Sequence, residues 1–301
     1  MVPPGIYTPI VTPFTETGEL DDTALALNVR RYLASPLTGL VVLGSNGEAA
    51  QLDDDEADRT IAQVRALVPR GRPLFAGTGR ESTRATIAAT ERAAACGVDA
   101  VMIRTPSFYK SQMTSDIFVR HFREVADASP VPVILYNVTV FTGVNLAADA
   151  VAALSEHPNI VGLKESGTDL VQLADTLSRM RDGFVVLAGS ASTLHAALSA
   201  GAHGAVLALA GLVPDLCVSL FAAVRAGRHH DALLLQRRLA PLARAIGPTF
   251  GVPGLKAALD LLGFRGGAPR APLRPAPAAA VEAIRAELAA LGALETSDAA
   301  R

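Results

Sequence analysis

Eight short apolar runs recur between residues 5 and 226, and each is followed by a stretch with helical character. The expected strands cover residues 5–14, 39–44, 73–78, 100–105, 131–137, 160–165, 184–189 and 204–209. The expected helices begin near residue 21 and then cover 53–68, 82–96, 115–128, 147–156, 169–180, 192–200 and 214–226. Near-continuous apolar strands that alternate with helices are typical of a parallel sheet covered on both faces. The sequence therefore predicts an α/β fold.

The number of units favours one of the two parallel architectures. Eight strand–helix units are what a closed (β/α)8 TIM barrel needs, whereas the alternative is an open doubly wound sheet. An open sheet that binds a dinucleotide would carry a G-x-G-x-x-G turn after its first strand, and none is present there. The sequence at 77–79 has two glycines but lacks the third, so it is interpreted as a strand-end loop. We therefore expect the barrel.

The pattern changes after Gly227, where strand-like runs stop. Leucine- and alanine-rich helices are expected at 229–246, 253–263 and 277–292, with a glycine- and proline-rich linker at 266–272. We expect a barrel domain over residues 1–226 and a small C-terminal helical domain over 227–301, which covers barrel helices or an oligomer contact. Residues 296–301 are expected to be a frayed tail.

Charge and composition exclude several classes of protein. The net charge is -2 with no basic cluster, which gives no indication of a nucleic acid or an anionic membrane as partner. No apolar run approaches the roughly 20 residues that span a bilayer, and the N-terminus lacks signal-peptide features. Cys96 and Cys217 are expected to be reduced, buried helix residues, and His229 and His230 a solvated pair rather than a metal site. We expect a cytoplasmic protein without a metal.

Lys164 is the candidate for covalent chemistry, because it interrupts the apolar run 160–165 close to its end. A buried ammonium group is costly unless it is paired or its pKa falls, and a lysine with a lowered pKa attacks ketones to form a Schiff base. The chain has only three lysines, Lys110, Lys164 and Lys256, among 27 Lys and Arg residues. The alternative is a lysine that extends from the strand end to water or to Glu165.

Two further strand ends carry groups that suit such a lysine, because the reacting groups of a (β/α)8 barrel gather at the C-terminal ends of its strands. The second strand ends in Gly-Ser-Asn-Gly-Glu, residues 44–48, a tight turn whose N–H groups can hold a carboxylate. The fifth strand ends at Tyr136 and Asn137, where a phenol can relay protons. The alternative for residues 44–48 is an ordinary turn between a strand and a helix, and the alternative for Tyr136 is a tyrosine at the edge of the core. Together, Ser45, Tyr136 and Lys164 fit a 2-oxo acid substrate.

These residues resemble the dihydrodipicolinate synthase / N-acetylneuraminate lyase superfamily, the pyruvate-dependent class I aldolases. The motifs that carry the resemblance are residues 44–48, 134–137 and 162–166, and the likeness extends over nearly the whole chain. Within the superfamily, the stretches 125–130, 157–162, 187–191 and 250–256 are most similar to mitochondrial-type 4-hydroxy-2-oxoglutarate aldolases. The resemblance implies a TIM barrel with a C-terminal helical domain, in a homotetramer or dimer.

The resemblance also assigns roles to individual residues. It gives Lys164 the Schiff base, Tyr136 the proton transfer and Ser45 a relay to that phenol. Tyr109 matches a tyrosine that reaches into a neighbouring subunit's site. The backbone of Ser45 and Asn46 would hold the pyruvate carboxylate, and Gly189 and Val206 would border the pyruvate pocket. No metal or organic cofactor is expected, since the imine on Lys164 is itself the electron sink.

Two positions depart from the family pattern. Thr139 stands where proline is usual, and Phe141 stands where the synthases have an arginine for the carboxylate of aspartate semialdehyde. Loss of a charge-assisted contact costs about 1.5–3 kcal/mol, and an apolar ring disfavours a carboxylate. We therefore expect cleavage of 4-hydroxy-2-oxoglutarate to pyruvate and glyoxylate, with Asn46 or Ser166 as neutral donors to glyoxylate. Phe141 also leaves the aldehyde open, since its ring could face an apolar or aromatic aldehyde.

Three other functions stay open at this point. The first is 4-hydroxy-tetrahydrodipicolinate synthase activity, which would condense pyruvate with aspartate semialdehyde. The second is a sugar-acid dehydratase that uses the same imine but eliminates water and releases no aldehyde. The third is a non-catalytic binding barrel, because a fold by itself does not establish an activity.

Overall fold

Eight parallel strands pair in chain order, and the eighth pairs with the first, so that the sheet closes into a barrel. The computed structural model describes residues 2–294. The strands are β1 Gly5–Pro9, β2 Gly39–Val42, β3 Leu74–Gly77, β4 Ala100–Arg104, β5 Val133–Asn137, β6 Ile160–Glu165, β7 Val185–Ala188 and β8 Gly204–Val206. The predicted (β/α)8 TIM barrel is confirmed.

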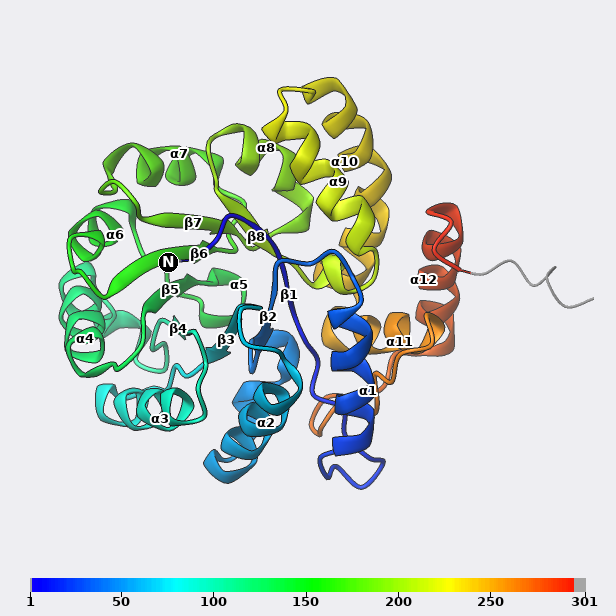
Figure 1. Ribbon diagram of the computed structural model, residues 1–301, viewed down its shortest axis with the longest axis horizontal. Helices are drawn as coiled ribbons and strands as arrows, with labels where there is room; N and C mark the ends of the chain where they lie inside the picture. The colour runs from blue at the N-terminus through cyan, green and yellow to red at the C-terminus, as the bar shows by residue number, and fades with distance from the viewer. Residues whose placement is uncertain (1, 295–301) are drawn as a thin grey trace, which may run out of the picture.

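Helices surround the strands, as Figure 1 shows. The barrel helices are α1 Asp22–Leu33, α2 Asp54–Leu67, α3 Thr83–Ala95, α4 Ser115–Ala128, α6 Ala148–Ser155, α7 Leu170–Arg179, α8 Leu194–Ser199 and α9 Pro214–Arg225. Local sequence fixes their starts, as in α2, where Asp53 and Glu56 each accept a hydrogen bond from the other's N–H group. This reciprocal cap satisfies two N–H groups that a helix start otherwise leaves free.

The strands alternate between two apolar environments. One set of side chains packs inside the barrel and includes Tyr7, Val41, Phe75, Ala100, Met102, Ile134, Tyr136, Val185, Leu187 and Val206. The other set, with Val101, Ile103 and Leu135 among its members, packs outward against the helices. Because successive strand residues point to opposite faces, a residue's place in this alternation shows whether it faces the barrel interior.

The C-terminal helices are α10 His229–Arg244, α11 Gly251–Leu261 and α12 Ala278–Ala290, which lie on one side of the barrel next to α9 and α1 (Figure 1). The segment between α11 and α12 returns to the barrel, where Ala268 pairs with Phe14 and the Asn28 side chain bonds the backbone N–H and C=O of Arg265. The division at residues 226 and 227 stays a prediction. The expected frayed tail, residues 296–301, lies outside the described residues.

Several expected boundaries were wrong. The first strand ends at Pro9 instead of Phe14, and Phe14 pairs with Leu20 and Ala268 instead of with a barrel strand. A short helix, α5 Thr139–Thr142, was not predicted; it follows β5 directly. Cys96 is only half-buried, since α3 ends before it, whereas Cys217 is buried.

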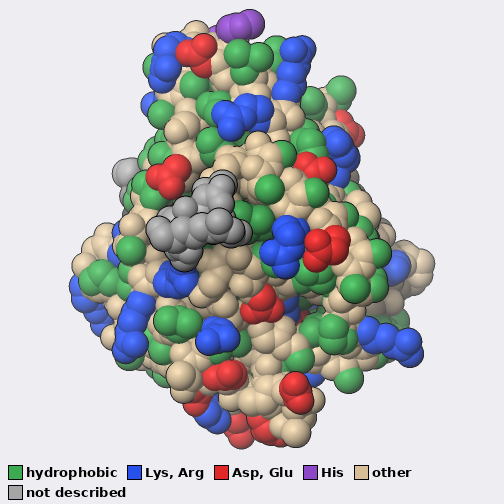
Figure 2. Space-filling view, turned by 90° about the vertical axis from the view of Figure 1, so that its right-hand side faces the viewer, with side chains coloured by type: hydrophobic (Ala, Val, Ile, Leu, Met, Phe, Trp, Pro, Cys, Tyr) green, Lys and Arg blue, Asp and Glu red, His purple; other side chains and the backbone are tan. Residues whose placement is uncertain are grey.

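Within residues 2–294, no helix is long and apolar enough to cross a membrane. Figure 2 shows the side of the molecule that lies on the right in Figure 1, where basic and acidic side chains are interspersed. His229 and His230 are exposed at the start of α10, as expected for a solvated pair.

Candidate active site

Lys164 and Tyr136 face each other at the C-terminal ends of β6 and β5. The two residues are register partners on neighbouring strands, and the Lys164 Nζ lies 4.1 Å from the centroid of the Tyr136 ring. Both are buried, with exposed fractions of 4% for Lys164 and 6% for Tyr136. The lysine therefore does not extend from the strand end into water, and the first alternative to a Schiff-base lysine is wrong.

Glu165 does not pair with Lys164, so the second alternative, a lysine that extends to Glu165, is also wrong. Its carboxylate accepts hydrogen bonds from the Asn137 side chain at 2.8 Å and from the Gly167 N–H at 2.6 Å. Burial raises the pKa of Glu165, although these donors oppose the rise. The strand alternation explains the difference, because neighbouring residues of β6 point to opposite faces of the sheet.

The Tyr136 phenol is set up for proton transfer. Its oxygen lies 3.4 Å from the Ser45 Oγ, which comes from the end of β2. Burial by itself would raise the pKa of Tyr136, but the Lys164 charge and hydrogen bonds from Ser45, Ser166 and Lys164 outweigh burial and lower this pKa. The ammonium group thus favours the phenolate, the form that can accept a proton.

The turn that carries Ser45 has an unusual backbone. Ser45, Asn46 and Gly47 form a single 3-10 turn, and it is flanked by Leu43 with φ 55° and Glu48 with φ 53°. These two are the only non-glycine residues with positive φ among residues 2–294. Such a conformation costs roughly 1–3 kcal/mol per residue and persists only where surrounding contacts enforce it.

The free N–H groups of this turn make it suitable for an anion. Its internal hydrogen bonds run from the Gly47 and Glu48 N–H groups to the Gly44 and Ser45 carbonyls. The N–H groups of Ser45 and Asn46 begin the turn, where a helical turn has no internal acceptors for them. The expected carboxylate site at Ser45 and Asn46 therefore has its two donors available, and the site itself stays a prediction.

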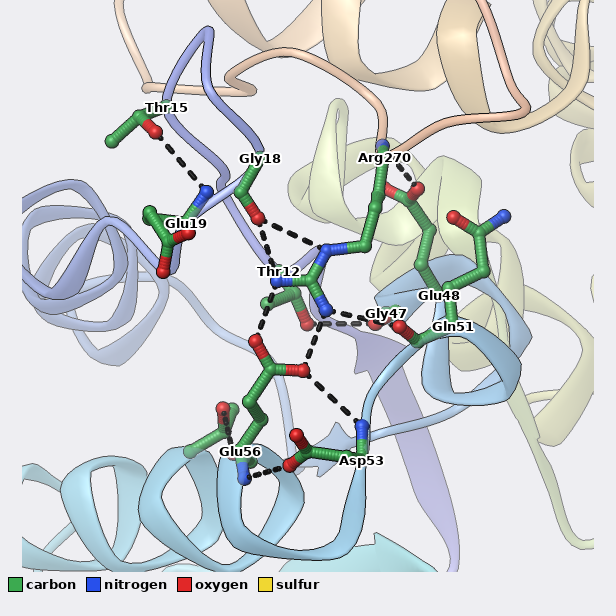
Figure 3. A network of polar contacts seen from close by, with 11 residues as sticks. Thr12, Thr15, Gly18, Glu19, Gly47, Glu48, Gln51, Asp53, Glu56 and Arg270 are labelled. Atoms are coloured by element: carbon green, nitrogen blue, oxygen red, sulfur yellow. Dashed lines mark hydrogen bonds and ion pairs between the residues drawn. The ribbon is translucent and has the colours of Figure 1, made fainter.

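Residues from distant parts of the chain hold the turn in place (Figure 3). The Thr12 hydroxyl donates to the Gly47 carbonyl at 2.7 Å. The Glu48 carboxylate lies 2.5 Å from the Lys256 Nζ of α11 and accepts the Arg270 N–H at 2.9 Å. The Glu48 and Lys256 side chains are only 1% and 2% exposed. The C-terminal segment is thus part of the scaffold that enforces the strained turn.

Arg270 extends the same scaffold toward α2. Its guanidinium binds both carboxylate oxygens of Glu56 at 2.6 Å and donates to the carbonyls of Gly18 and Gln51 (Figure 3). Bidentate pairs of this kind fix geometry as well as adding energy. Sequence reasoning missed Thr12, Glu48, Lys256 and Arg270 as supports; the rarity of lysine and the Glu that ends the motif were the available signals.

The remaining residues of the expected pyruvate pocket lie around this pair. Ser166 and Gly189 directly follow β6 and β7, and a side chain at residue 189 would overlap the Ser166 hydroxyl. The absence of a side chain at Gly189 therefore leaves room for the Ser166 side chain. This is a different reason for a glycine than the close approach of a ligand to the backbone. Val206, at the end of β8, is buried in the barrel interior with Leu187. Their contact with a substrate stays a prediction.

Tyr109 lies at the surface of its own chain. Its side chain is 70% exposed on the loop after β4 and packs edge-on against Phe108, with ring centroids 5.1 Å apart. Val140 and Phe141 of α5 are also exposed, at 74% and 64%. The two aromatic side chains of the loop, Phe108 and Tyr109, thus do not pack into the core of this chain.

Sequence reasoning also missed Arg104. Ala100 and Met102 face the barrel interior, so the alternation of β4 places Arg104 on the same side at the end of the strand. Its register partner is Tyr136. A charged residue at an inward position of an expected strand was the signal that could have identified it.

The arrangement supplies an amine, a phenol and free N–H donors at one end of a barrel. Such a set can form an imine with a 2-oxo acid, hold its carboxylate and move a proton. Within the part of the chain that the structure describes, no three His, Cys, Asp or Glu side chains are grouped so that they could hold a metal ion.

Known proteins resemble this chain over almost its whole length. Residues 3–291 match the Dihydrodipicolinate synthetase family. A 4-hydroxy-tetrahydrodipicolinate synthase of Exiguobacterium sp. is 38% identical over 92% of this chain and 94% of its own. A probable mitochondrial 4-hydroxy-2-oxoglutarate aldolase of Emericella nidulans is 35% identical over 89% of this chain and 88% of its own.

The fold comparison agrees. The crystal structure of dihydrodipicolinate synthase from Thermotoga maritima superposes with a TM-score of 0.93 at 30% identity, and covers 98% of this chain and 100% of that one. The chain therefore belongs to the Dihydrodipicolinate synthetase family. It is an enzyme, a pyruvate-dependent aldolase of that family that acts on carbon–carbon bonds.

Proposed function

We propose that this enzyme cleaves 4-hydroxy-2-oxoglutarate to pyruvate and glyoxylate through a Schiff base on Lys164. The observation that carries the proposal is the buried pair in which the Lys164 Nζ lies 4.1 Å from the centre of the Tyr136 ring. A buried amine beside a phenol whose pKa is lowered can form an imine and pass protons without a metal or an organic cofactor.

The steps follow from these groups. The neutral Lys164 amine adds to the C2 carbonyl, and loss of water gives a protonated imine. The Tyr136 phenolate takes the proton of the C4 hydroxyl, the C3–C4 bond breaks, and its electron pair moves to the imine to give an enamine. Glyoxylate leaves. Protonation of C3 and hydrolysis of the imine release pyruvate and restore Lys164.

The Ser45 turn has a binding role and a relay role in this scheme. Its free N–H groups, at Ser45 and Asn46, would hold the C1 carboxylate, and the Ser45 hydroxyl would pass the proton on from Tyr136. Ser166, Gly189 and Val206 would border the C3 side of the bound pyruvate unit. These assignments rest on the placement of the residues and on the family resemblance.

The choice of aldehyde rests on Phe141. An apolar side chain that is 64% exposed on α5 gives no charge for the carboxylate of aspartate semialdehyde. The Emericella nidulans relative, named a probable 4-hydroxy-2-oxoglutarate aldolase, supports the same choice. The second candidate is 4-hydroxy-tetrahydrodipicolinate synthase, and the comparisons favour it over the aldolase, because it is the name of the Exiguobacterium relative, the more similar of the two, and of most of the similar proteins.

We also propose that the enzyme is a homo-oligomer in which Tyr109 completes the site of a neighbouring copy. Four large apolar side chains are each at least 64% exposed: Phe108 and Tyr109 on the loop after β4, and Val140 and Phe141 on α5, which follows β5. Exposed apolar groups that cluster in this way mark interaction surfaces. A partner that covers them would bring Tyr109 close to a second mouth.

The test compares kcat/KM for cleavage of 4-hydroxy-2-oxoglutarate with kcat/KM for condensation of pyruvate and aspartate semialdehyde. This ratio measures the difference in transition-state binding. The proposal expects cleavage to be preferred, and Phe141→Arg to raise condensation relative to cleavage. A preference of the unmodified enzyme for aspartate semialdehyde would replace the proposal by the synthase function. A product mixture without any aldehyde would indicate the dehydratase.

A further inference from the structure

Arg104 stands in line with the two reacting groups. The register places Arg104 of β4 opposite Tyr136 of β5, and Tyr136 opposite Lys164 of β6. Neighbouring strands are about 4.8 Å apart, so the backbone of Arg104 lies about 10 Å from that of Lys164 at the same level of the barrel. The alternation of β4 puts Arg104 on the inward side together with Ala100 and Met102, and its Cγ packs against Gly79, where an added Cβ would come within 2.8 Å of it.

The guanidinium of Arg104 is only partly engaged. Its Nη1 donates to the Glu81 carboxylate at 2.7 Å and to the Thr105 carbonyl at 3.1 Å. The Nε and Nη2 atoms make no hydrogen bond with other groups among residues 2–294, and the side chain is 28% exposed. Arginine presents five N–H donors in a planar fork that matches a carboxylate, so donors remain for a ligand in the mouth.

Glu81 fixes the guanidinium in this position. One of its oxygens pairs with Arg104, and the other accepts the N–H groups of Ser107 and Phe108, both at 2.8 Å. Glu81 therefore cannot follow Arg104 toward a substrate without releasing the loop that carries the aromatic residues. A cation held by a fixed counter-ion, with its free edge still available, is pre-organised for a second anion.

We propose that Arg104 is a specificity-determining residue that binds the second carboxylate of a dicarboxylic 2-oxo acid, the group at the far end from the carbon attached to Lys164. The inference rests on the proposed function and adds the substrate class to it. In 4-hydroxy-2-oxoglutarate this carboxylate belongs to the departing glyoxylate. Tyr136 lies between Arg104 and Lys164 in the barrel. It would then face the C4 hydroxyl, which lies between the second carboxylate and the carbon attached to Lys164.

This assignment explains how a mouth with Phe141 on α5 takes a doubly charged substrate. The charge comes from β4 instead, on the other side of Tyr136. A role of Arg104 only in holding the 107–108 loop through Glu81 is the competing explanation. The two differ in one respect: a loop anchor affects all substrates alike, whereas a carboxylate ligand affects only those that carry the second carboxylate.

The experiment measures kcat/KM of Arg104→Met and Arg104→Lys for 4-hydroxy-2-oxoglutarate and for 4-hydroxy-2-oxopentanoate, in which a methyl group replaces the second carboxylate. Loss of a charge-assisted, two-point contact predicts that Arg104→Met lowers the ratio of the two kcat/KM values about 10- to 100-fold. Arg104→Lys should recover part of this loss, since it keeps the charge without the fork. An unchanged ratio would overturn the proposal.

Two further measurements separate the possible failures. Glu81→Gln should lower both kcat/KM values by similar factors, and Arg80→Met, whose arginine pairs with Asp54 of α2, should leave the ratio unchanged. Competition of 2-oxoglutarate and 2-oxobutanoate against borohydride trapping of pyruvate tests binding even if the enzyme does not cleave 4-hydroxy-2-oxoglutarate. If Arg104→Met weakens both competitors equally, the inference is wrong while the Schiff-base function stands; absence of any pyruvate adduct would refute the function.

Discussion

The ammonium nitrogen of Lys164 lies over the face of the Tyr136 ring, 4.1 Å from its centroid. The negative face of the ring attracts the cation, and the nearby charge in turn lowers the pKa of the phenol. The charge on Lys164 therefore favours the phenolate form of Tyr136, which is the form that can accept the proton of a substrate hydroxyl.

Replacement of Lys164 tests the covalent step. Pyruvate plus borohydride should add one reduced adduct to the unmodified chain, and Lys164→Arg should abolish it, because a guanidinium stays protonated and forms no imine. Cleavage should fall by at least about a thousandfold when the nucleophile is removed. Mass spectrometry of the intact chain and of its peptides gives the adduct and its position.

Lys110→Arg is the matched control, since Lys110 is the exposed lysine of the same chain. It should keep the adduct. An adduct that survives in Lys164→Arg would end the assignment of the Schiff base to this residue.

Tyr136→Phe tests the phenol separately from the lysine. The ring under the Lys164 ammonium is retained, but the proton acceptor 3.4 Å from the Ser45 hydroxyl is lost. We expect kcat to fall about 10²- to 10⁴-fold, the usual contribution of a positioned acid or base, with a smaller change in KM. Stopped assays over a range of substrate concentrations separate the two parameters. A variant with nearly full kcat would assign the proton transfer to another group.

The barrel and the residues at its mouth could be predicted from the sequence because each strand has a local signature. Lys164, Tyr136 and Ser45 end apolar runs, and the closed eight-stranded topology brings strand ends together. The pairing of Glu48 with Lys256 could not be predicted, because 208 positions separate them and neither lies in a periodic pattern with the other. It depends on how the C-terminal segment returns to the barrel, which is a property of tertiary packing.

Arg104 shows a different limit. The run 100–105 was correctly interpreted as a strand, but the direction of each side chain depends on which alternate set faces the barrel interior. In a strand buried on both faces, hydrophobicity does not distinguish the two sets.

Lys256→Met should destabilise the enzyme strongly. The ammonium is buried against Glu48 at 2.5 Å and also donates to the Ala268 carbonyl at 2.8 Å, so its removal leaves a buried carboxylate without its charge partner. Breaking a buried pair from one side costs about 3–5 kcal/mol. Urea-induced unfolding measures this free energy.

The double variant Glu48→Gln, Lys256→Met is the control for that prediction. It removes both charges, and the glutamine oxygen can still accept the Arg270 N–H. Most of the lost stability should return. If the single and the double variant are equally destabilised, charge imbalance is not the cause. An increase in the KM for 4-hydroxy-2-oxoglutarate in the double variant would further show that the pair positions the Ser45 turn.

His121 predicts how stability depends on pH. It is buried on α4 with its Nδ1 2.8 Å from the Thr83 hydroxyl, and burial lowers its pKa from 6.5 to about 4, although Glu81 opposes the shift. The unfolded chain therefore binds more protons between these values, so the free energy of unfolding falls as the pH drops from about 6.5 to about 4. The loss for this residue is about 3 kcal/mol.

Denaturant unfolding of the unmodified enzyme and of His121→Phe at several pH values checks the sign and the source. The phenylalanine cannot take up a proton, so its stability should fall less steeply over the same interval. Above pH 7 the two curves should run parallel. Equal slopes in both proteins below pH 6.5 would assign the acid sensitivity to other groups.

Mixing two inactive variants tests whether Tyr109 works in a neighbour's site. Tyr109→Phe leaves every site without the shared hydroxyl, and Lys164→Arg leaves every site without the amine. In a mixed dimer, the subunit with Tyr109→Phe keeps its own Lys164 and receives Tyr109 from its partner, so one complete site per dimer forms. Activity should rise toward about a quarter of that of the unmodified enzyme after random reassociation of equal amounts, because half of the dimers are mixed and each has one complete site. The exposed position of Tyr109 supports this arrangement.

The control is the same mixture made from Tyr136→Phe and Lys164→Arg. It should stay inactive, since Tyr136 and Lys164 belong to the mouth of the same chain. Recovery in that control, or none with Tyr109→Phe, would refute the shared site.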